Sequence, residues 1–288
     1  MRIERILKNK KTLSFELFPP TDEKRIDDVF ETSKRIKDFN PDFVSITDSK
    51  KWGKTKHIAL AKILREKFGF NIMIHMKCVG NTEKEIRFIL EEMKRLDFKN
   101  ILALKGDEND EDIKRVKKAF TSSLDLLKII PSFFSCGVAL YPASHPDTPM
   151  EKEIELIKKK IELGAKFGIT QMFLDICELE RFIEILEKNS IKIPVIAGIM
   201  PVTSYKIFKN IVMKASNISI PHTYRRIIEK FSSDKKKDDF FKASIEYISD
   251  MVDKVIKTKI SGIHFFTLNN KKGVVEIIKK TELCRKLN

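Results

Sequence analysis

The amino-acid sequence predicts a (β/α)8 barrel, also called a TIM barrel. Eight short runs of apolar, β-branched or aromatic residues alternate with longer charged, amphipathic runs. This alternation is typical of parallel βα units. Most runs begin about 25–35 residues after the previous one, as expected for a barrel of about 250 residues. We therefore expect the 288 residues to form a single domain, residues 1–288.

The eight apolar runs are the expected strands. They cover residues 12–18, 42–47, 71–78, 100–107, 133–141, 167–175, 193–201 and 260–269. Charged runs between them have the spacing of amphipathic helices, at residues 23–39, 83–96 and 151–167 among others.

Local features support these helices. In the first of them one face carries Ile26, Val29, Phe30 and Ile36. The second opens on a capping box that begins at Thr82. Gly164 falls near the end of the third, where a helix often stops.

The stretch from residue 201 to 260 is too long for one βα unit. It carries two or three helix patterns, including residues 223–231 and 240–256. We expect a helical insertion before the last strand. The competing fold, a doubly wound open sheet, usually binds nucleotides through G-x-G-x-x-G, and the sequence contains neither this fingerprint nor a P-loop.

The net charge of +15 favours a polyanion as partner when it is taken alone. However, 44 of the 56 basic residues are Lys, which lacks the planar fork that Arg offers to phosphates and bases. These lysines are spread among Glu and Asp, with the densest runs at residues 158–160 and 235–237. We expect mostly solvated helix faces, and a nucleic-acid-binding protein is the lower-ranked alternative.

Three classes of protein are disfavoured by composition. No apolar run approaches the roughly 20 residues of a membrane span, and no secretory signal is evident, so we expect a cytoplasmic protein. The four cysteines lie far apart, which excludes a zinc ribbon and disfavours a disulfide framework. His75, His145 and Asp107 could converge, but without short ligand spacing we expect no metal site.

Polar residues occur at nearly every expected strand end, which is where barrel enzymes carry their chemistry. They are Glu16, Thr47, His75, Lys105, Gly106, Asp107, Tyr141, His145, Gln171, Gly198, Thr267 and Asn269. Each has a structural alternative: a residue on the outer strand face, a turn or helix start after Gly106, a structural histidine, or a polar group within a core network.

Glu16 is the sharpest of these candidates. It lies between Phe15 and Leu17, and Phe18 and two prolines follow. A carboxyl group in such surroundings should have a raised pKa and could hold a proton near neutral pH. Glu16 is therefore a candidate general acid, although simple strand alternation would also allow an outward-facing side chain.

Seven motifs along the chain fit one known family. They are SFELFPP, FVSIT, ILALKGD, YPASHP, GAKFGITQMFLD, GIMPVTS and HFFTLN. In this order they resemble methylenetetrahydrofolate reductase of the bacterial, single-domain type, over nearly the whole chain. The resemblance implies non-covalent FAD, NADH or NADPH as donor, and ping-pong reduction of methylenetetrahydrofolate to methyltetrahydrofolate for methionine synthesis. It also implies a homo-oligomer.

The resemblance assigns roles residue by residue. Glu16 matches the general acid, Asp107 a carboxylate beside flavin and folate, and Gln171 a residue that contacts both alternating substrates. The FAD-contacting positions correspond to Thr47, His75, Lys105, Gly106, Tyr141, His145 and Lys160. Looser matches to FAD contacts are Asp48, Phe120, Thr121, Glu153 and Lys159.

Several positions depart from the family pattern. Asp48 and the residue after it stand where the family usually has Tyr-Gly, Lys105 replaces an Arg, and Asn270 replaces the Arg that follows the last strand. Ile211 stands where some members have a Phe that stacks on the substrate. These changes bear on affinity and donor choice, and they keep open a flavin-binding barrel with another electron donor or partner.

Overall fold

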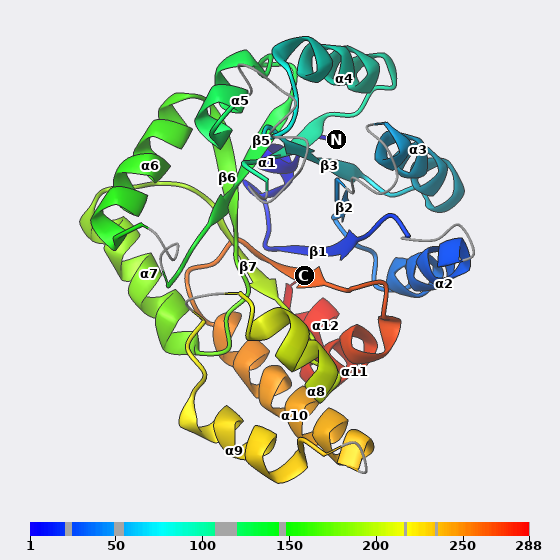
Figure 1. Cartoon of the computed structure of the whole chain (residues 1–288), viewed down its shortest axis with the longest axis vertical. Coiled ribbons are helices and arrows are strands. Elements are labelled where there is room, and N and C mark those ends of the chain that lie inside the picture. Colours follow the sequence, from blue (N-terminus) through cyan, green and yellow to red (C-terminus); the bar gives the residue numbers. More distant parts are fainter. Residues whose placement is uncertain are drawn as a thin grey trace.

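The computed structural model describes residues 1–20, 25–48, 55–106, 120–143, 148–215, 218–233 and 236–287. Eight parallel strands form a closed barrel in sequence order, surrounded by helices, and the predicted fold is confirmed (Figure 1). The strands are β1 (Thr12–Leu17), β2 (Phe43–Ile46), β3 (Ile72–Lys77), β4 (Asn100–Leu104), β5 (Ser135–Leu140), β6 (Ala165–Thr170), β7 (Val195–Ile199) and β8 (Gly262–Phe266).

The sixth strand is shorter at its end than the sequence predicts. The apolar run continues to residue 175, but β6 ends at Thr170. Asp175 instead caps α7 (Ile176–Lys188), where its carboxylate accepts a hydrogen bond from the Cys177 N–H at 3.0 Å. The intervening Met172, Phe173 and Leu174 are buried, so their apolar character reflects core packing rather than a strand.

Helices form the outer layer of the barrel. They are α2 (Ile26–Lys37), α3 (Lys56–Phe68), α4 (Glu83–Arg95), α5 (Ser123–Ile129), α6 (Met150–Glu162), α7 and, after β8, α11 (Lys271–Thr281). The predicted capping box is present, because the Glu85 carboxylate accepts from the Thr82 N–H at 2.8 Å and the Thr82 hydroxyl accepts from the Glu85 N–H at 3.2 Å.

The insertion before β8 contains three short elements and one long helix. The short elements are α8 (Tyr205–Ile207), the π-helix η4 (Phe208–Val212) and α9 (His222–Phe231). The long helix α10 (Lys237–Val255) packs against α7 and α11 and so takes the place of the regular barrel helix. The inserted part is therefore α8, η4 and α9.

A buried hydroxyl pair fastens α9 to α10. The Ser244 hydroxyl donates to the Val202 carbonyl at 2.7 Å, and its oxygen lies 2.7 Å from the Tyr224 hydroxyl. Because the single Ser244 proton is already used, Tyr224 is the donor in this pair. All of these groups are buried, so each hydroxyl depends on its neighbour for a partner.

Removing either hydroxyl should therefore have unequal effects. Ser244→Ala leaves two buried groups without partners, and we expect it to cost about 2–4 kcal/mol in the free energy of unfolding, whereas Tyr224→Phe should cost about 1 kcal/mol. Urea denaturation of the two variants measures this. Equal losses would contradict the donor assignment.

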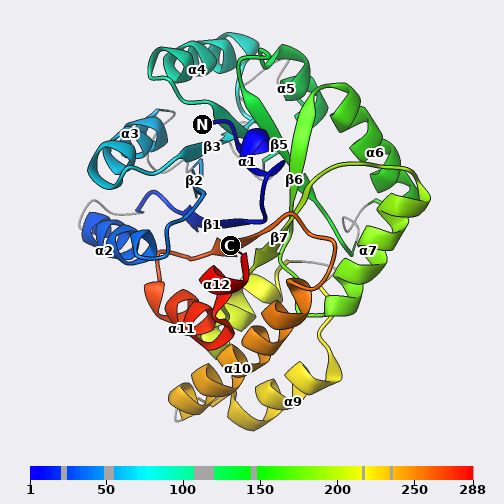
Figure 2. The same cartoon turned by 180° about the vertical axis from the view of Figure 1, so that it is seen from behind.

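The N-terminal end of the barrel is closed by the start of the chain. In α1 (Ile3–Ile6), Ile3 is fully buried against inward-facing residues such as Phe43, Met73 and Leu102. The Ile3 N–H donates to the Asn100 side-chain oxygen at 2.9 Å. Figure 2 shows α1 across this end of the barrel. The C-terminal ends of the strands form the other end.

Candidate active site

Two adjoining cavities lie at the C-terminal ends of the strands. The central cavity, of about 760 Å³, has a largely apolar wall that carries these polar residues: Glu16, Thr47, Asp48, His75, Lys77, Tyr141, Thr170 and Gln171. The lateral cavity, of about 480 Å³, is lined among others by Lys105, Gly106, Thr121, Glu153 and Lys160. The two share four residues, Lys77, Leu104, Ala139 and Tyr141, so together they can hold one elongated ligand.

Glu16 points into the central cavity, and the outward-facing alternative is wrong. Its neighbour Phe15 faces the other way and stacks on Phe265. Glu16 is only 6% exposed, and burial raises the pKa of its carboxyl group to about 8. The side chain therefore carries its proton at neutral pH.

His75 lies beside this carboxyl group, with 3.5 Å between its Nε2 and the Glu16 Oε2. Burial, with smaller contributions from repulsion by His264 and Lys77, lowers the pKa of His75 to about 3. Because both side chains are neutral at pH 7, the short distance is not an ion pair. A charged imidazole would have favoured the carboxylate, so the neutral ring leaves Glu16 protonated.

A third histidine supports the floor of the site. The Ser14 hydroxyl donates to the Ile263 carbonyl at 3.1 Å, so its oxygen accepts from the His264 Nδ1–H at 2.8 Å. The His264 Nε2 then accepts from the Ser45 hydroxyl at 3.3 Å. This arrangement fixes a neutral tautomer, consistent with a pKa that burial lowers to about 3. His264 was not among the candidates predicted from the sequence. It lies two residues before Phe266 on β8, so both side chains are on the same face of the strand.

The end of β1 is held by polar residues after β8. The Thr267 hydroxyl donates to the Glu16 carbonyl at 2.6 Å. The Asn269 side chain accepts from the Phe18 N–H at 3.0 Å and donates to the Phe18 carbonyl at 2.8 Å. Thr267 and Asn269, which the sequence placed at the last strand end, thus position the backbone that carries Glu16.

The lateral cavity contains a buried ion pair on α6. The Lys160 ammonium group lies 3.6 Å from the Glu153 carboxylate and donates to the Ala139 carbonyl at 3.2 Å. Lys160 follows Glu153 by seven positions, about two helical turns, so both lie on the inner face of the helix. Burial lowers the pKa of Lys160, and Glu153 partly offsets this shift.

The remaining candidate residues predicted from the sequence do not all line the two cavities. Gln171 follows β6 instead of lying within it, and it is exposed at the central cavity. Lys159 is exposed on α6, and neither Lys159 nor Phe120 lines either cavity within the described part of the chain. Asp107 and His145 lie outside the described residues.

Comparison with known proteins identifies the family. The family model for methylenetetrahydrofolate reductase matches residues 2–282. The chain belongs to this family. The resemblance read from the motifs is thus confirmed.

Relatives of the methylenetetrahydrofolate reductase family are similar along nearly the whole chain. The 5,10-methylenetetrahydrofolate reductase of Buchnera aphidicola subsp. Baizongia pistaciae is 30% identical, over 95% of this chain and 92% of its own length. Methylenetetrahydrofolate reductase (NADH) 1 of Arabidopsis thaliana is 29% identical over 92% of this chain. This chain spans 47% of the length of the Arabidopsis relative.

A solved structure shares the fold of this family member. It is an uncharacterized protein from Clostridium thermocellum, described as binding two copies of 5-methyl-5,6,7,8-tetrahydrofolic acid. Its TM-score is 0.71 at 15% sequence identity, and 99% of each chain is covered. At this identity the likeness supports the barrel alone.

Two departures from the methylenetetrahydrofolate reductase pattern have visible positions. The Asn270 side chain accepts from the Lys272 N–H at 3.1 Å and so caps α11. Ile211, on η4, lines the central cavity. A π-helix is rare, and such elements frequently occur at functional sites.

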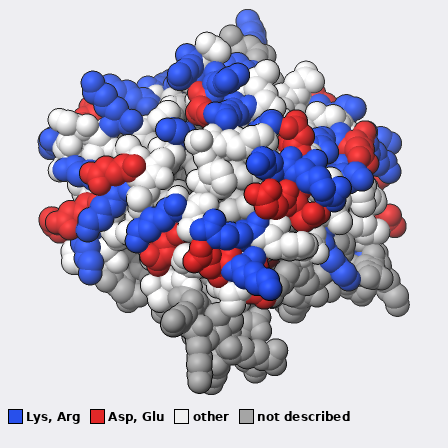
Figure 3. Space-filling model, turned by 90° about the horizontal axis from the view of Figure 1, so that it is seen from above, with Lys and Arg blue, Asp and Glu red and all other residues white. Residues whose placement is uncertain are grey.

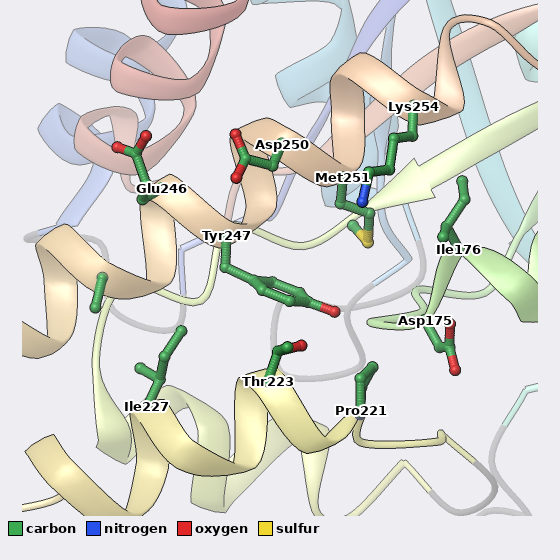
Figure 4. Close-up of a pocket in the computed structure, with 11 residues that line it drawn as sticks. Asp175, Ile176, Pro221, Thr223, Ile227, Glu246, Tyr247, Asp250, Met251 and Lys254 are labelled. Carbon is green, nitrogen blue, oxygen red and sulfur yellow. The ribbon is translucent and has the colours of Figure 1, made fainter.

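A third cavity, of about 600 Å³, lies away from the strand ends between α7, α9 and α10 (Figure 4). The Tyr247 hydroxyl donates to the Leu174 carbonyl at 2.7 Å and so ties α10 to the loop before α7. The carboxylates of Asp175, Glu246 and Asp250 line this cavity together with Lys254. This acidic lining distinguishes it from the lateral cavity.

Surface charge and helix hydropathy bear on the predicted solvated helix faces and on the predicted lack of a membrane span. On the face shown in Figure 3, basic and acidic side chains are interspersed, and pairs such as Arg87 with Glu83 occur along helices. This distribution fits solvated helix faces. No helix in the described part of the chain has the length and hydropathy needed to span a membrane.

Proposed function

We propose that this protein reduces 5,10-methylenetetrahydrofolate to 5-methyltetrahydrofolate, with non-covalently bound FAD and with NADH or NADPH as electron donor. The observation that carries the proposal is Glu16, a buried carboxyl group that faces a large cavity in a chain of this family, and burial raises its pKa to about 8. The product would supply methyl groups for methionine synthesis.

The two cavities fit the chemistry of FAD. The central cavity offers apolar walls with a few polar groups, which suits a planar ring system. Beyond the residues it shares with the central cavity, the lateral cavity offers Lys105 and Lys160 together with Glu153, which suits a diphosphate. The residues that would hold the cofactor are Thr47, Asp48, His75, Tyr141, Lys105, Gly106, Thr121, Glu153 and Lys160.

Glu16 would act as the general acid. Its carboxyl group gives a proton to N10 of the folate, the bond between N10 and the bridging methylene carbon breaks, and N10 keeps the electron pair. The methylene carbon is left as a cationic iminium group on N5. FAD, when bound and reduced, supplies the hydride that this carbon accepts. Proton donation of this kind typically contributes 10²–10⁴-fold in rate.

Other residues of the chain would prepare this step. Burial keeps Glu16 protonated beside the neutral His75, and Thr267 and Asn269 hold the strand end in place. Gln171, exposed at the central cavity, would contact folate and nicotinamide in turn. Asp107 would stabilise the cationic iminium group, as the family resemblance implies.

The test is to follow the two half-reactions separately without oxygen. We expect the purified protein to bind FAD, NADH or NADPH to bleach the flavin absorbance, and methylenetetrahydrofolate to restore it. Both donors are compared, because relatives are named for NADH in Arabidopsis thaliana and NADPH in Caenorhabditis elegans. A protein that cannot be reconstituted with FAD, or reduced flavin that the folate does not reoxidise, would overturn the proposal.

A further inference from the structure

A half-buried lysine lies where the two cavities meet. Lys77 lines both the central and the lateral cavity. It follows His75 by two residues on β3, and strand alternation directs both side chains into the barrel. A ligand that extends from one cavity into the other must pass this side chain.

The stem of Lys77 is held by the neighbouring backbone. A Cβ atom added to Gly106 would lie 3.3 Å from both Cβ and Cδ of Lys77. The methylene groups of Lys77 thus run closely along the Gly106 backbone. Gly106 also has a φ of +91°, a conformation that L-residues with side chains rarely adopt. The glycine therefore lets the lysine stem lie flat and carry its ammonium group to the junction.

Lys77 has no ion-pair partner among the described residues, although the carboxylate of Asp48 lines the same central cavity. The charge of Lys77 contributes to the lowered pKa of His75, after burial and repulsion from His264. It acts in the same direction on His57 of α3, after burial and an opposing effect of Asp48. Lys160 differs, because Glu153 lies beside it. A cation in a partly enclosed cavity that forms no ion pair with the described residues favours an anionic ligand.

We propose that Lys77 stabilises the negative charge of reduced FAD at the N1 edge of its ring and so raises the midpoint potential of the bound flavin. This inference rests on the proposed function. The ribityl chain of FAD leaves the ring at N10, next to N1. With the ring in the central cavity and the diphosphate in the lateral one, that edge lies at the junction. A charge near N1 tunes the electronic properties of the flavin.

Lys77→Met tests the inference through binding and redox potential. We expect reduced FAD to lose about tenfold more affinity than oxidised FAD, which for a two-electron couple lowers the midpoint potential by about 30 mV. Lys77→Arg keeps the charge, so its ratio of affinities should stay within about twofold of wild type. Titration of apoprotein with oxidised FAD and dye-coupled potentiometry give both quantities.

Lys192→Met is the matched control, because Lys192 is exposed before β7, at the opposite end of the barrel. It should change neither quantity. An unchanged midpoint potential in Lys77→Met would overturn the inference. The affinity for FAD could then be unchanged, or oxidised and reduced FAD could both bind equally more weakly. The second result is the one expected if Lys77 contacts a phosphate. Failure of the wild-type protein to bind FAD would overturn the proposed function as well. A working wild type beside an unaltered Lys77→Met would overturn only this inference.

Discussion

Glu16→Gln should slow the reoxidation of flavin by methylenetetrahydrofolate by about 10³-fold, the size expected for loss of a general acid. Glutamine has the shape of the protonated carboxyl group but cannot give its proton to N10. Reduction of the flavin by NADH needs no such proton, so this half-reaction should remain mostly intact. Anaerobic stopped-flow absorbance measures both.

The pH dependence of the folate half-reaction provides a second test of Glu16 as the general acid. Burial raises the pKa of Glu16 to about 8, so the wild-type folate half-reaction should be level below that pH and fall above it. The raised pKa also makes the free energy of unfolding depend on pH. Its stabilising contribution is fully present below about pH 4.5, the ordinary pKa of a glutamate, and is lost as the pH rises toward 8. Glu16→Gln should remove both dependences.

Glu178→Gln provides the matched control. Glu178 is a buried carboxyl group on α7 whose pKa is also raised by burial, and it lines neither cavity. Its replacement should leave both half-reactions unchanged. Equal loss of both half-reactions in Glu16→Gln, or a folate half-reaction with an unaltered pH profile, would show that Glu16 is not the acid.

Lys160→Met should lower the free energy of unfolding by about 3–5 kcal/mol, because it leaves a buried charge without its partner. Glu153 is only 2% exposed and has Lys160 as its ion-pair partner. The double variant Glu153→Gln with Lys160→Met should recover much of this loss. Urea denaturation at pH 7 gives the comparison.

Lys159→Met is the matched control for this second prediction. The two lysines are adjacent in the sequence, but Lys159 is exposed on the outer side of α6. Surface substitutions of this kind usually stay within about 0.5 kcal/mol. If Lys160→Met were as mild as Lys159→Met, the buried pair would not be a source of stability.

The barrel could be predicted from periodicity because each strand is a short, buried, apolar run. The sixth strand shows the limit of that pattern. Met172, Phe173 and Leu174 are apolar because they are buried, and no local feature distinguishes a buried irregular segment from a strand. Asp175 caps the N-terminus of α7, and this contact shows that the strand has ended before residue 175.

The site was predictable where a polar residue interrupts an apolar run, as at Glu16. Lys77 was missed, although the spacing of two from His75 places both on one strand face. The roles of Thr267 and Asn269 were beyond reach, because they depend on bonds to residues 251 positions away in the chain. Family resemblance paired Lys159 with Lys160, but one step along a helix turns a side chain by about 100°.

The closed N-terminal end of the barrel restricts the routes by which a bound molecule can leave. Ile3 and the apolar residues packed around it fill the N-terminal end of the barrel, so among the described residues the central cavity lies open toward the C-terminal strand ends. A molecule bound deep in the cavity must therefore escape past whatever occupies the entrance. A ligand bound at the entrance should then lengthen the residence time of a ligand bound beneath it. The dissociation rate of the deeper ligand should therefore rise with the fraction of time for which the entrance is unoccupied.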